Sequence, residues 1–188
     1  MSNIEKEIRL KINTNDIKKI KDITKTYKEK TRLIDITCGK FGFDSLKKLG
    51  YICRIRFKNN NYKLEIKKYI NNNDCIEKSI KLQNIKEGLE LLSLLDMNPY
   101  LILDRYREVR KYNDLLIYID EFDTIGPYIE IEYQNSTYDN VIDFCKKINI
   151  DIVPQDKYGD IVKEKLETSE EFKKDFELSL KKTLKNNL

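Results

Sequence analysis

The chain contains no histidine, and this absence excludes more chemistry than any other feature of its composition. Serine or cysteine nucleophiles that depend on a histidine base are excluded, and so are the usual zinc sites. Any catalysis by this chain must therefore use carboxylates, lysine, arginine, tyrosine or a metal ion that prefers oxygen ligands.

Cysteine is scarce, and the four cysteines are not arranged as metal ligands. Cys38, Cys53, Cys75 and Cys145 show no CxxC or similar spacing. A chain of 188 residues is also large enough to build a core without disulfide bonds. We therefore expect reduced thiols in a cytoplasmic protein.

Long apolar runs and linker-like segments are absent as well. No run is long enough to span a bilayer, and no basic start with an apolar middle suggests a signal peptide, so we expect no membrane partner. No proline-rich or serine-rich linker and no repeat divides the chain. We expect one domain over residues 1–165, and an amphipathic helix over 166–188 that packs on this domain or extends from it.

Charge is abundant but mixed in sign. The chain has 36 basic and 32 acidic residues, for a net charge of +4. A nucleic-acid-binding protein usually has a dedicated basic surface, so we expect no nucleic-acid partner.

Charged and apolar residues alternate in segment after segment, beginning with residues 4–12. Because successive side chains of a strand point to opposite faces, Glu5, Glu7, Arg9 and Lys11 share one face there, and isoleucines and Leu10 dominate the other. The pattern predicts further strands over 31–37, 51–58, 62–69, 75–82, 100–112, 115–122 and 128–133.

Helical spacing of apolar residues predicts two helices between these strands and two after the last of them. The expected helices cover 16–27, 86–95, 137–148 and the segment from Ser169 onward. Residues 38–50 are expected to form a loop, and asparagine-rich turns at 59–61 and 71–74 predict antiparallel hairpins.

The predicted sheet has an apolar face for the helices and a charged face, and two architectures fit this pattern. An open sheet with a solvated charged face is one interpretation. The charges are sorted, however: acids gather at Glu5, Glu7, Asp120, Glu130 and Glu132, while arginine and lysine dominate the strands between them. Closing about eight strands into a barrel would enclose these charges in a polar interior that holds one small ligand.

Such a mixed interior favours a particular ligand. Converging arginines and lysines suit a triphosphate, because arginine binds phosphate oxygens through paired hydrogen bonds. The carboxylates beside them would repel that anion unless a cation lay between, and carboxylate oxygens suit Mg²⁺ or Mn²⁺. The pattern therefore indicates a phosphoryl-transfer or nucleotidyl-transfer site in outline.

Several short motifs carry a resemblance to a known family over roughly residues 3–165. They are Glu5-Lys6-Glu7-Ile8-Arg9, Arg54-Ile55-Arg56, Glu65-Ile66-Lys67, Arg105-Tyr106-Arg107, Ile119-Asp120-Glu121-Phe122, Ile125-Gly126-Pro127-Tyr128-Ile129-Glu130-Ile131-Glu132 and, in part, Lys157-Tyr158-Gly159-Asp160-Ile161-Val162. Together they resemble the CYTH proteins, or triphosphate tunnel metalloenzymes. This family includes class IV adenylyl cyclases, thiamine triphosphatases and inorganic triphosphatases.

The resemblance implies an α+β fold, a closed antiparallel eight-stranded barrel with helices packed on its outside. It implies metal ligands, with Mg²⁺ or Mn²⁺ as the cofactor, at Glu5, Glu7, Glu130 and Glu132, and Asp120 would either bind the metal or orient a ligand. It implies substrate contacts at Arg9, Lys11, Arg54, Arg56, Lys63, Glu65, Lys67, Glu77, Lys81, Arg105 and Arg107. The residues expected to act in catalysis are Glu5, Glu7, Arg9, Lys67, Glu130 and Glu132.

Two departures from the family pattern keep the expected function open. Arg9 stands where the family usually has lysine, and Cys75-Ile76-Glu77-Lys78-Ser79 retains one acid of an R-x-E-x-E strand. The first expectation is a metal-dependent triphosphate hydrolase. The alternatives are a class IV adenylyl cyclase and a non-catalytic sensor of triphosphates or polyphosphates. The partner is a small triphosphate in each case, and the apolar stripe of the tail leaves a homodimer open.

Overall fold

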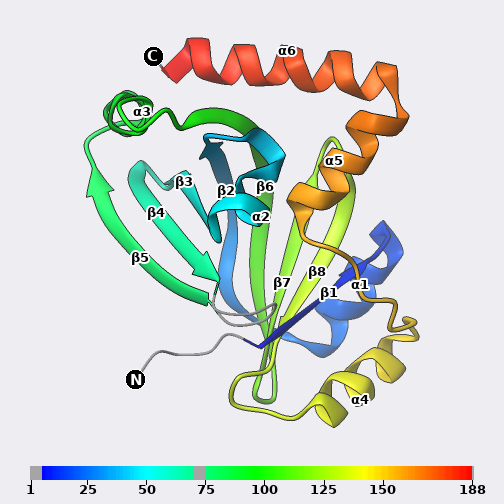
Figure 1. The fold of residues 1–188 in the computed structure, drawn as a ribbon. Coiled ribbons are helices and arrows are strands. Elements are labelled where there is room, and N and C mark those ends of the chain that lie inside the picture. The colour runs from blue at the N-terminus through cyan, green and yellow to red at the C-terminus, as the bar shows by residue number, and fades with distance from the viewer. Residues whose placement is uncertain (1–5, 70–74, 188) are drawn as a thin grey trace. The chain divides into compact units, whose positions relative to one another are not determined.

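The computed structural model describes residues 6–69 and 75–187 of the chain. Within them, eight antiparallel strands form one sheet in the order β1-β8-β7-β6-β2-β3-β4-β5, accompanied by six α-helices (Figure 1). The eight antiparallel strands and the α+β class expected from the sequence are confirmed.

The chain divides into two compact units. Unit 1 consists of Met1–Arg32 and Arg105–Lys157, and unit 2 consists of Leu33–Asp104 and Tyr158–Leu188. Two long strands, β2 (Lys25–Gly39) and β6 (Asn98–Tyr112), contribute residues to both units. The expectation of a single domain over 1–165 stays a prediction.

Unit 1 combines three complete strands with two helices. These are β1 (Glu7–Lys11), α1 (Thr14–Ile23), β7 (Leu115–Phe122), β8 (Gly126–Glu132) and α4 (Tyr138–Ile148). Strand β8 lies between β1 and β7, and both pairings are antiparallel (Figure 1). The apolar face of these strands packs against α1 and α4 in a core that includes Leu10, Ile117, Ile129, Ile20 and Phe144.

The first helix ends four residues earlier than the predicted 16–27. It begins with a capping box, in which Asn13 Oδ1 accepts from Asp16 N at 3.1 Å and Asp16 Oδ2 accepts from Asn13 N at 3.0 Å. Thr24 is already extended, and Tyr27 belongs to β2. The reason is tertiary: Arg110 of β6 hydrogen-bonds to both the hydroxyl and the carbonyl of Thr24, which holds the chain where it leaves the helix.

Unit 2 combines three complete strands with four α-helices and one 3₁₀ turn among its described residues. These are η1 (Gly42–Asp44), α2 (Ser45–Leu49), β3 (Tyr51–Lys58), β4 (Asn61–Tyr69), β5 (Cys75–Leu82), α3 (Ile85–Ser93), α5 (Tyr158–Thr168) and α6 (Glu170–Asn187). The strands β3, β4 and β5 pair in sequence as antiparallel neighbours (Figure 1). A second core includes Ile36, Ile55, Leu64, Leu82 and Leu92.

Three local predictions in unit 2 need correction. The predicted loop over 38–50 contains η1 and α2, and Gly50 ends α2 with a positive φ of 72°. Helix α5 was not expected at all. Ile76 and Ile80, predicted to lie on the covered apolar face of β5, are 41% and 57% exposed, because the helical cover reaches Leu82 at the end of that strand but not these two residues.

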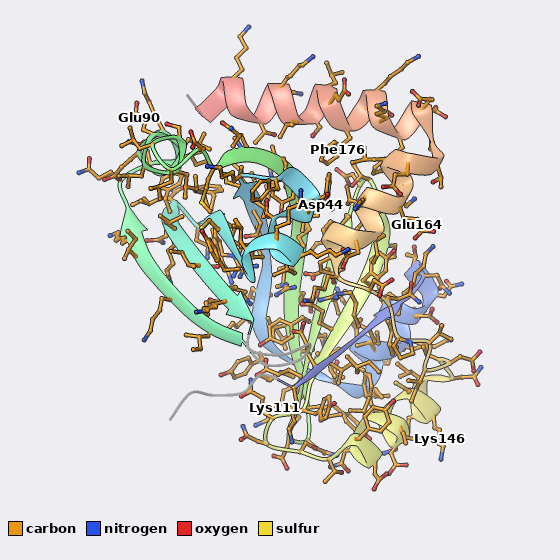
Figure 2. All side chains as sticks on the ribbon, viewed as in Figure 1. Asp44, Glu90, Lys111, Lys146, Glu164 and Phe176 are labelled. Carbon is orange, nitrogen blue, oxygen red and sulfur yellow. The ribbon has the colours of Figure 1, made fainter. Side chains whose placement is uncertain are left out.

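The tail helix is confirmed as α6, and it follows α5 directly. Phe176, which Figure 2 labels on this helix, is buried. Phe172 and Leu180 are half-buried, so the apolar stripe is only partly covered. No helix among the described residues combines the length and the hydrophobicity that crossing a membrane requires.

Candidate functional site: two charged strand faces

Strand register places the predicted acids and bases of unit 1 on one face of the sheet. Glu7 is opposite Glu132, and Arg9 is opposite Glu130, in the pairing of β1 with β8. Directly opposite residues have neighbouring Cβ atoms on the same face. We call this surface, which also includes Arg105, Arg107, Tyr118 and Asp120, the charged face of unit 1. Glu5 lies outside the described residues.

Glu130 is at the centre of the charged face of unit 1 and is bound by two arginines. Arg9 donates to its Oε1 through Nε at 3.0 Å and also through Nη2, and Arg107 Nη2 donates to its Oε2 at 2.5 Å. Burial alone would raise the pKa of Glu130, but the guanidinium groups of Arg107 and Arg9 outweigh it and lower the pKa to about 2. Glu130 is therefore a buried anion at neutral pH.

Asp120 is completely buried and holds the other two-arginine contact of this face. Arg107 binds it through two hydrogen bonds, with Nε donating to Oδ1 at 2.6 Å and Nη2 donating to Oδ2. Arg105 Nε lies 3.3 Å from the same Oδ1. Paired hydrogen bonds fix the plane of a guanidinium group, so Asp120 orients Arg107.

The remaining acids of this face, Glu132 and Glu7, are bound less by cations than Glu130 and Asp120 are. Glu132 accepts hydrogen bonds from two neutral groups, the Tyr118 hydroxyl at 2.6 Å and the Gln134 side-chain amide. Glu7 accepts from Arg9 Nη2 at 3.3 Å, and its side chain is 46% exposed. These carboxylates are thus more accessible to a ligand than Glu130 is.

The donor set of this face has the chemistry that a divalent metal requires. Carboxylate oxygens without histidine or thiolate suit Mg²⁺ or Mn²⁺. In the described part of the chain, no three such groups already converge on one point. The hydrogen bonds explain this, because Glu130 is directed toward Arg9 and Arg107 and not toward Glu7 and Glu132. These carboxylates fit a divalent metal ion if Glu130 releases one of its arginine partners and binds the ion in its place.

Unit 2 has a charged face of its own, formed by β2, β3, β4 and β5. Arg56 is opposite Asp35 and binds it through two hydrogen bonds, Nε to Oδ1 at 2.7 Å and Nη2 to Oδ2 at 2.9 Å. Arg54 is opposite Glu65 and donates to its Oε2 at 2.6 Å. Asp35 and Glu65 are both buried, so each fixes an arginine. We call this surface the charged face of unit 2.

Lys67 and Glu77 complete the charged face of unit 2. They are directly opposite in the β4–β5 pairing, with Lys67 Nζ 2.8 Å from Glu77 Oε2, and Arg54 Nη2 lies 3.6 Å from the same oxygen. Burial would raise the pKa of Glu77, but Lys67 and Arg54 lower it. Burial alone would lower the pKa of Arg54, but the carboxylates of Asp35, Glu65 and Glu77 raise it. Arg54, Arg56 and Lys67 are therefore each already paired with an acid.

Three predicted substrate contacts lie at the exposed margins of these faces. Lys63 and Lys81 are opposite each other in the β4–β5 pairing, and Lys11 is opposite Tyr128 at the end of β1. All three lysines are exposed. Their role in substrate binding stays a prediction.

Sequence reasoning missed three residues that the structure places on the charged faces. Asp35 is buried beside Arg56, and Tyr118 and Gln134 bind Glu132. Asp35 had a detectable signal, because it is a lone acid between two isoleucines in a predicted strand. For Tyr118 and Gln134 no signal separated them from the chain's other tyrosines and amides.

Three of the cysteines, Cys38, Cys53 and Cys145, take no part in either face. Cys38, Cys53 and Cys145 are free and buried. Burial raises the pKa of Cys38 to about 12 and that of Cys145 to about 11, which makes both thiols poor nucleophiles.

Comparisons with known proteins identify a family and a fold. The sequence matches the family model of the CYTH domain over residues 3–153. The comparison with curated proteins found no match.

Solved structures with the same fold come from archaea, bacteria and a plant. The PH1819 protein of Pyrococcus horikoshii is 21% identical with a TM-score of 0.69, over 86% of this chain and 99% of that chain. A candidate adenylate cyclase from Vibrio parahaemolyticus is 12% identical with a TM-score of 0.67, over 87% and 99%. A candidate adenylyl cyclase from Hippeastrum, described as having a dominant triphosphatase activity, is 16% identical with a TM-score of 0.57, over 82% and 93%. These likenesses concern the fold alone.

Proposed function

Because the chain belongs to the CYTH family, we propose that it hydrolyses the triphosphate group of a small molecule with the help of Mg²⁺ or Mn²⁺. Inorganic triphosphate, thiamine triphosphate and nucleoside triphosphates are the candidate substrates, because all contain the group that arginines recognise. Water attacks the terminal phosphorus, and the rest of the molecule leaves as a diphosphate.

The observation that carries this proposal is the pairing of the Glu130 carboxylate with two guanidinium groups on the charged face of unit 1. Arg9 and Arg107 bind the carboxylate of Glu130, which presents to them the same kind of oxygens as a phosphate group. A triphosphate can therefore replace the carboxylate at the arginines, and a divalent cation can replace the arginines at the carboxylate. The bound triphosphate would thus separate the arginines from Glu130, and the bound metal ion would take their place at its carboxylate.

The residues of unit 1 would have two roles, metal binding and phosphate binding. Glu7, Glu130 and Glu132, with Glu5 outside the described residues, would hold the metal ion. Arg9 and Arg107 would bind and orient the phosphate oxygens, and Asp120 would keep Arg107 in position. When bound, the metal ion supplies positive charge that neutralises the phosphate oxygens and stabilises the charge of the transition state.

The charged face of unit 2 has phosphate-binding candidates of its own, which are Arg54, Arg56 and Lys67. Asp35 is buried and bound to Arg56, so it would stay in place. Glu77 is 34% exposed in its side chain, so a phosphate could displace it from Lys67 more easily. Preorganised cations of this kind are a major source of catalysis in phosphoryl transfer.

A product analysis tests the proposed reaction. Purified protein is incubated with inorganic triphosphate, thiamine triphosphate or ATP, each with Mg²⁺, Mn²⁺ or a chelator, and phosphate and cyclic AMP are measured in the same samples. We expect phosphate release that requires the metal. Cyclic AMP with pyrophosphate would replace the proposal with a class IV adenylyl cyclase. Tight triphosphate binding without any product would replace it with a sensor.

A matched pair of glutamate variants tests the site. Glu130 and Glu108 are both buried, and each is bound by two basic side chains, but Glu108 lies on the opposite face of the sheet. We expect Glu130→Gln to lower metal-dependent turnover by about 10²-fold or more, the usual effect of losing a transition-state contact. We expect Glu108→Gln to retain metal-dependent turnover at temperatures at which this variant is folded. Equal turnover in the two variants would remove the proposed site.

A further inference from the structure

Glu130 and Glu132 are two residues apart on β8 but have different kinds of partner. Glu130 is bound by the guanidinium groups of Arg9 and Arg107. Glu132 is bound by the hydroxyl of Tyr118 and the side-chain amide of Gln134, and in the described part of the chain it makes no ion pair. Two hydrogen bonds therefore hold the Glu132 carboxylate in place, and none of the described residues is a direct cationic partner of it.

Tyr118 contacts the charged face of unit 1 in two ways. Its hydroxyl donates to Glu132 Oε2 at 2.6 Å, and its ring lies 5.0 Å from Arg107 Cζ in a cation–π contact. In the β7–β8 register Tyr118 is opposite Glu130, so it reaches Glu132 diagonally across the strand pair. One side chain thus touches both a proposed metal ligand and a proposed phosphate ligand.

We propose that Tyr118 is a positioning residue that orients Glu132 for the metal ion through its hydroxyl and supports Arg107 through its ring. The inference rests on the proposed function. Each carboxylate oxygen can accept more than one hydrogen bond or ligand, so the bond from Tyr118 leaves Oε2 able to bind a cation. Partners that orient a metal ligand typically change metal affinity about 10-fold to 100-fold when they are removed.

Two substitutions separate the two contacts. Tyr118→Phe removes the hydroxyl and keeps the ring, and Tyr118→Leu removes both. Tyr112→Phe is a matched control, because Tyr112 is a half-buried tyrosine of the same unit that packs on Phe144 away from the charged face. Circular dichroism and the midpoint of thermal unfolding establish that each variant is folded.

The first measurement is binding of Mn²⁺ alone to the free protein by titration calorimetry, a readout that does not depend on turnover. We expect Tyr118→Phe to weaken Mn²⁺ binding about 10-fold or more, as for other partners of metal ligands, while Tyr112→Phe stays at the wild-type value. In a Glu132→Gln background the same change should have no further effect, because the hydroxyl acts through Glu132. Unchanged Mn²⁺ affinity in Tyr118→Phe, or an equal loss in both backgrounds, would overturn the inference.

The second measurement is binding of inorganic triphosphate in the presence of a chelator. We expect Tyr118→Phe to bind like wild type, and Tyr118→Leu to bind about 3-fold to 30-fold more weakly, the range that a lost cation–π contact corresponds to. Equal triphosphate affinities in Tyr118→Leu and wild type would overturn the inference that the ring of Tyr118 supports Arg107. If wild-type protein binds neither Mn²⁺ nor triphosphate, the proposed function itself fails, a result distinct from failure of the Tyr118 variants alone.

Discussion

Two arginines of β6, Arg107 and Arg110, lie three residues apart and on opposite faces of the sheet, with side chains that are 15% and 10% exposed. Arg107 faces the charged side of unit 1, and all its hydrogen bonds described above are to carboxylates, Asp120 and Glu130. Arg110 faces the apolar side and binds the segment where α1 ends. The two residues have similar burial and opposite expected roles.

Arg110 donates five hydrogen bonds, mostly to groups that a ligand would not replace. Its partners are the Thr24 hydroxyl and carbonyl, the Thr26 hydroxyl, the Lys21 carbonyl and Glu108. Lys21 Nζ binds the second oxygen of Glu108 at 2.7 Å, which completes the network. Burial and the presence of several hydrogen bonds therefore do not separate the two arginines, whereas the type of partner described for each does.

The largest effect is expected from Arg110→Met. The substitution removes one partner of a buried charged network and leaves the Thr24 segment without its donors, which typically costs about 3–5 kcal/mol. Urea unfolding should show this loss as a lower midpoint, while turnover of the folded protein stays near wild type. A variant with normal stability and lost turnover would contradict the structural role of Arg110.

A smaller but functionally decisive effect is expected from Arg107→Met. Asp120 keeps Arg105 and Glu130 keeps Arg9 in this variant, so the free energy of unfolding should change less than in Arg110→Met. Turnover of the best triphosphate substrate should fall about 10²-fold to 10³-fold, because a phosphate contact of the transition state is lost. Steady-state kinetics and urea unfolding of both variants measure turnover and the free energy of unfolding. A larger loss of stability in Arg107→Met together with a larger loss of turnover in Arg110→Met would refute the expected roles.

The smallest effect is expected from pH. The folded-state pKa of Glu130 is about 2, below the unfolded value of about 4.3, so its contribution to stability is present above pH 4.3 and is lost as the pH falls toward 2. Thermal unfolding midpoints between pH 6 and pH 3 should therefore fall less in Glu130→Gln than in wild type. Parallel pH dependence of the two proteins would show that the arginines do not lower the pKa of Glu130.

Glu108 sharpens the pH comparison on the opposite face. Burial would raise its pKa, but Lys21 and Arg110 lower it, so its contribution to stability is lost in the same acidic direction. The pKa values of the two glutamates therefore shift in the same direction, although we propose different roles for them. A pKa shift alone would not have distinguished the candidate site from the network around Arg110.

Local alternation was enough to locate most strands. The predicted strands over 51–58, 75–82 and 115–122 coincide with β3, β5 and β7. It was also enough to place Arg54 with Arg56 and Glu130 with Glu132 on shared faces, because the side-chain period of a strand is two. Element ends were less predictable: α1 stops at Ile23 because Arg110, distant in sequence, holds Thr24.

The sequence by itself therefore determined the family, the strands and the types of charged group on each face. Only the tertiary structure decided the partners: Asp35 with Arg56, Asp120 with Arg107, and Tyr118 with Glu132. The physical reason is that alternation is a local property of one strand. A hydrogen bond between strands depends on which strands are neighbours and on their register, and both are set by packing over the whole sheet.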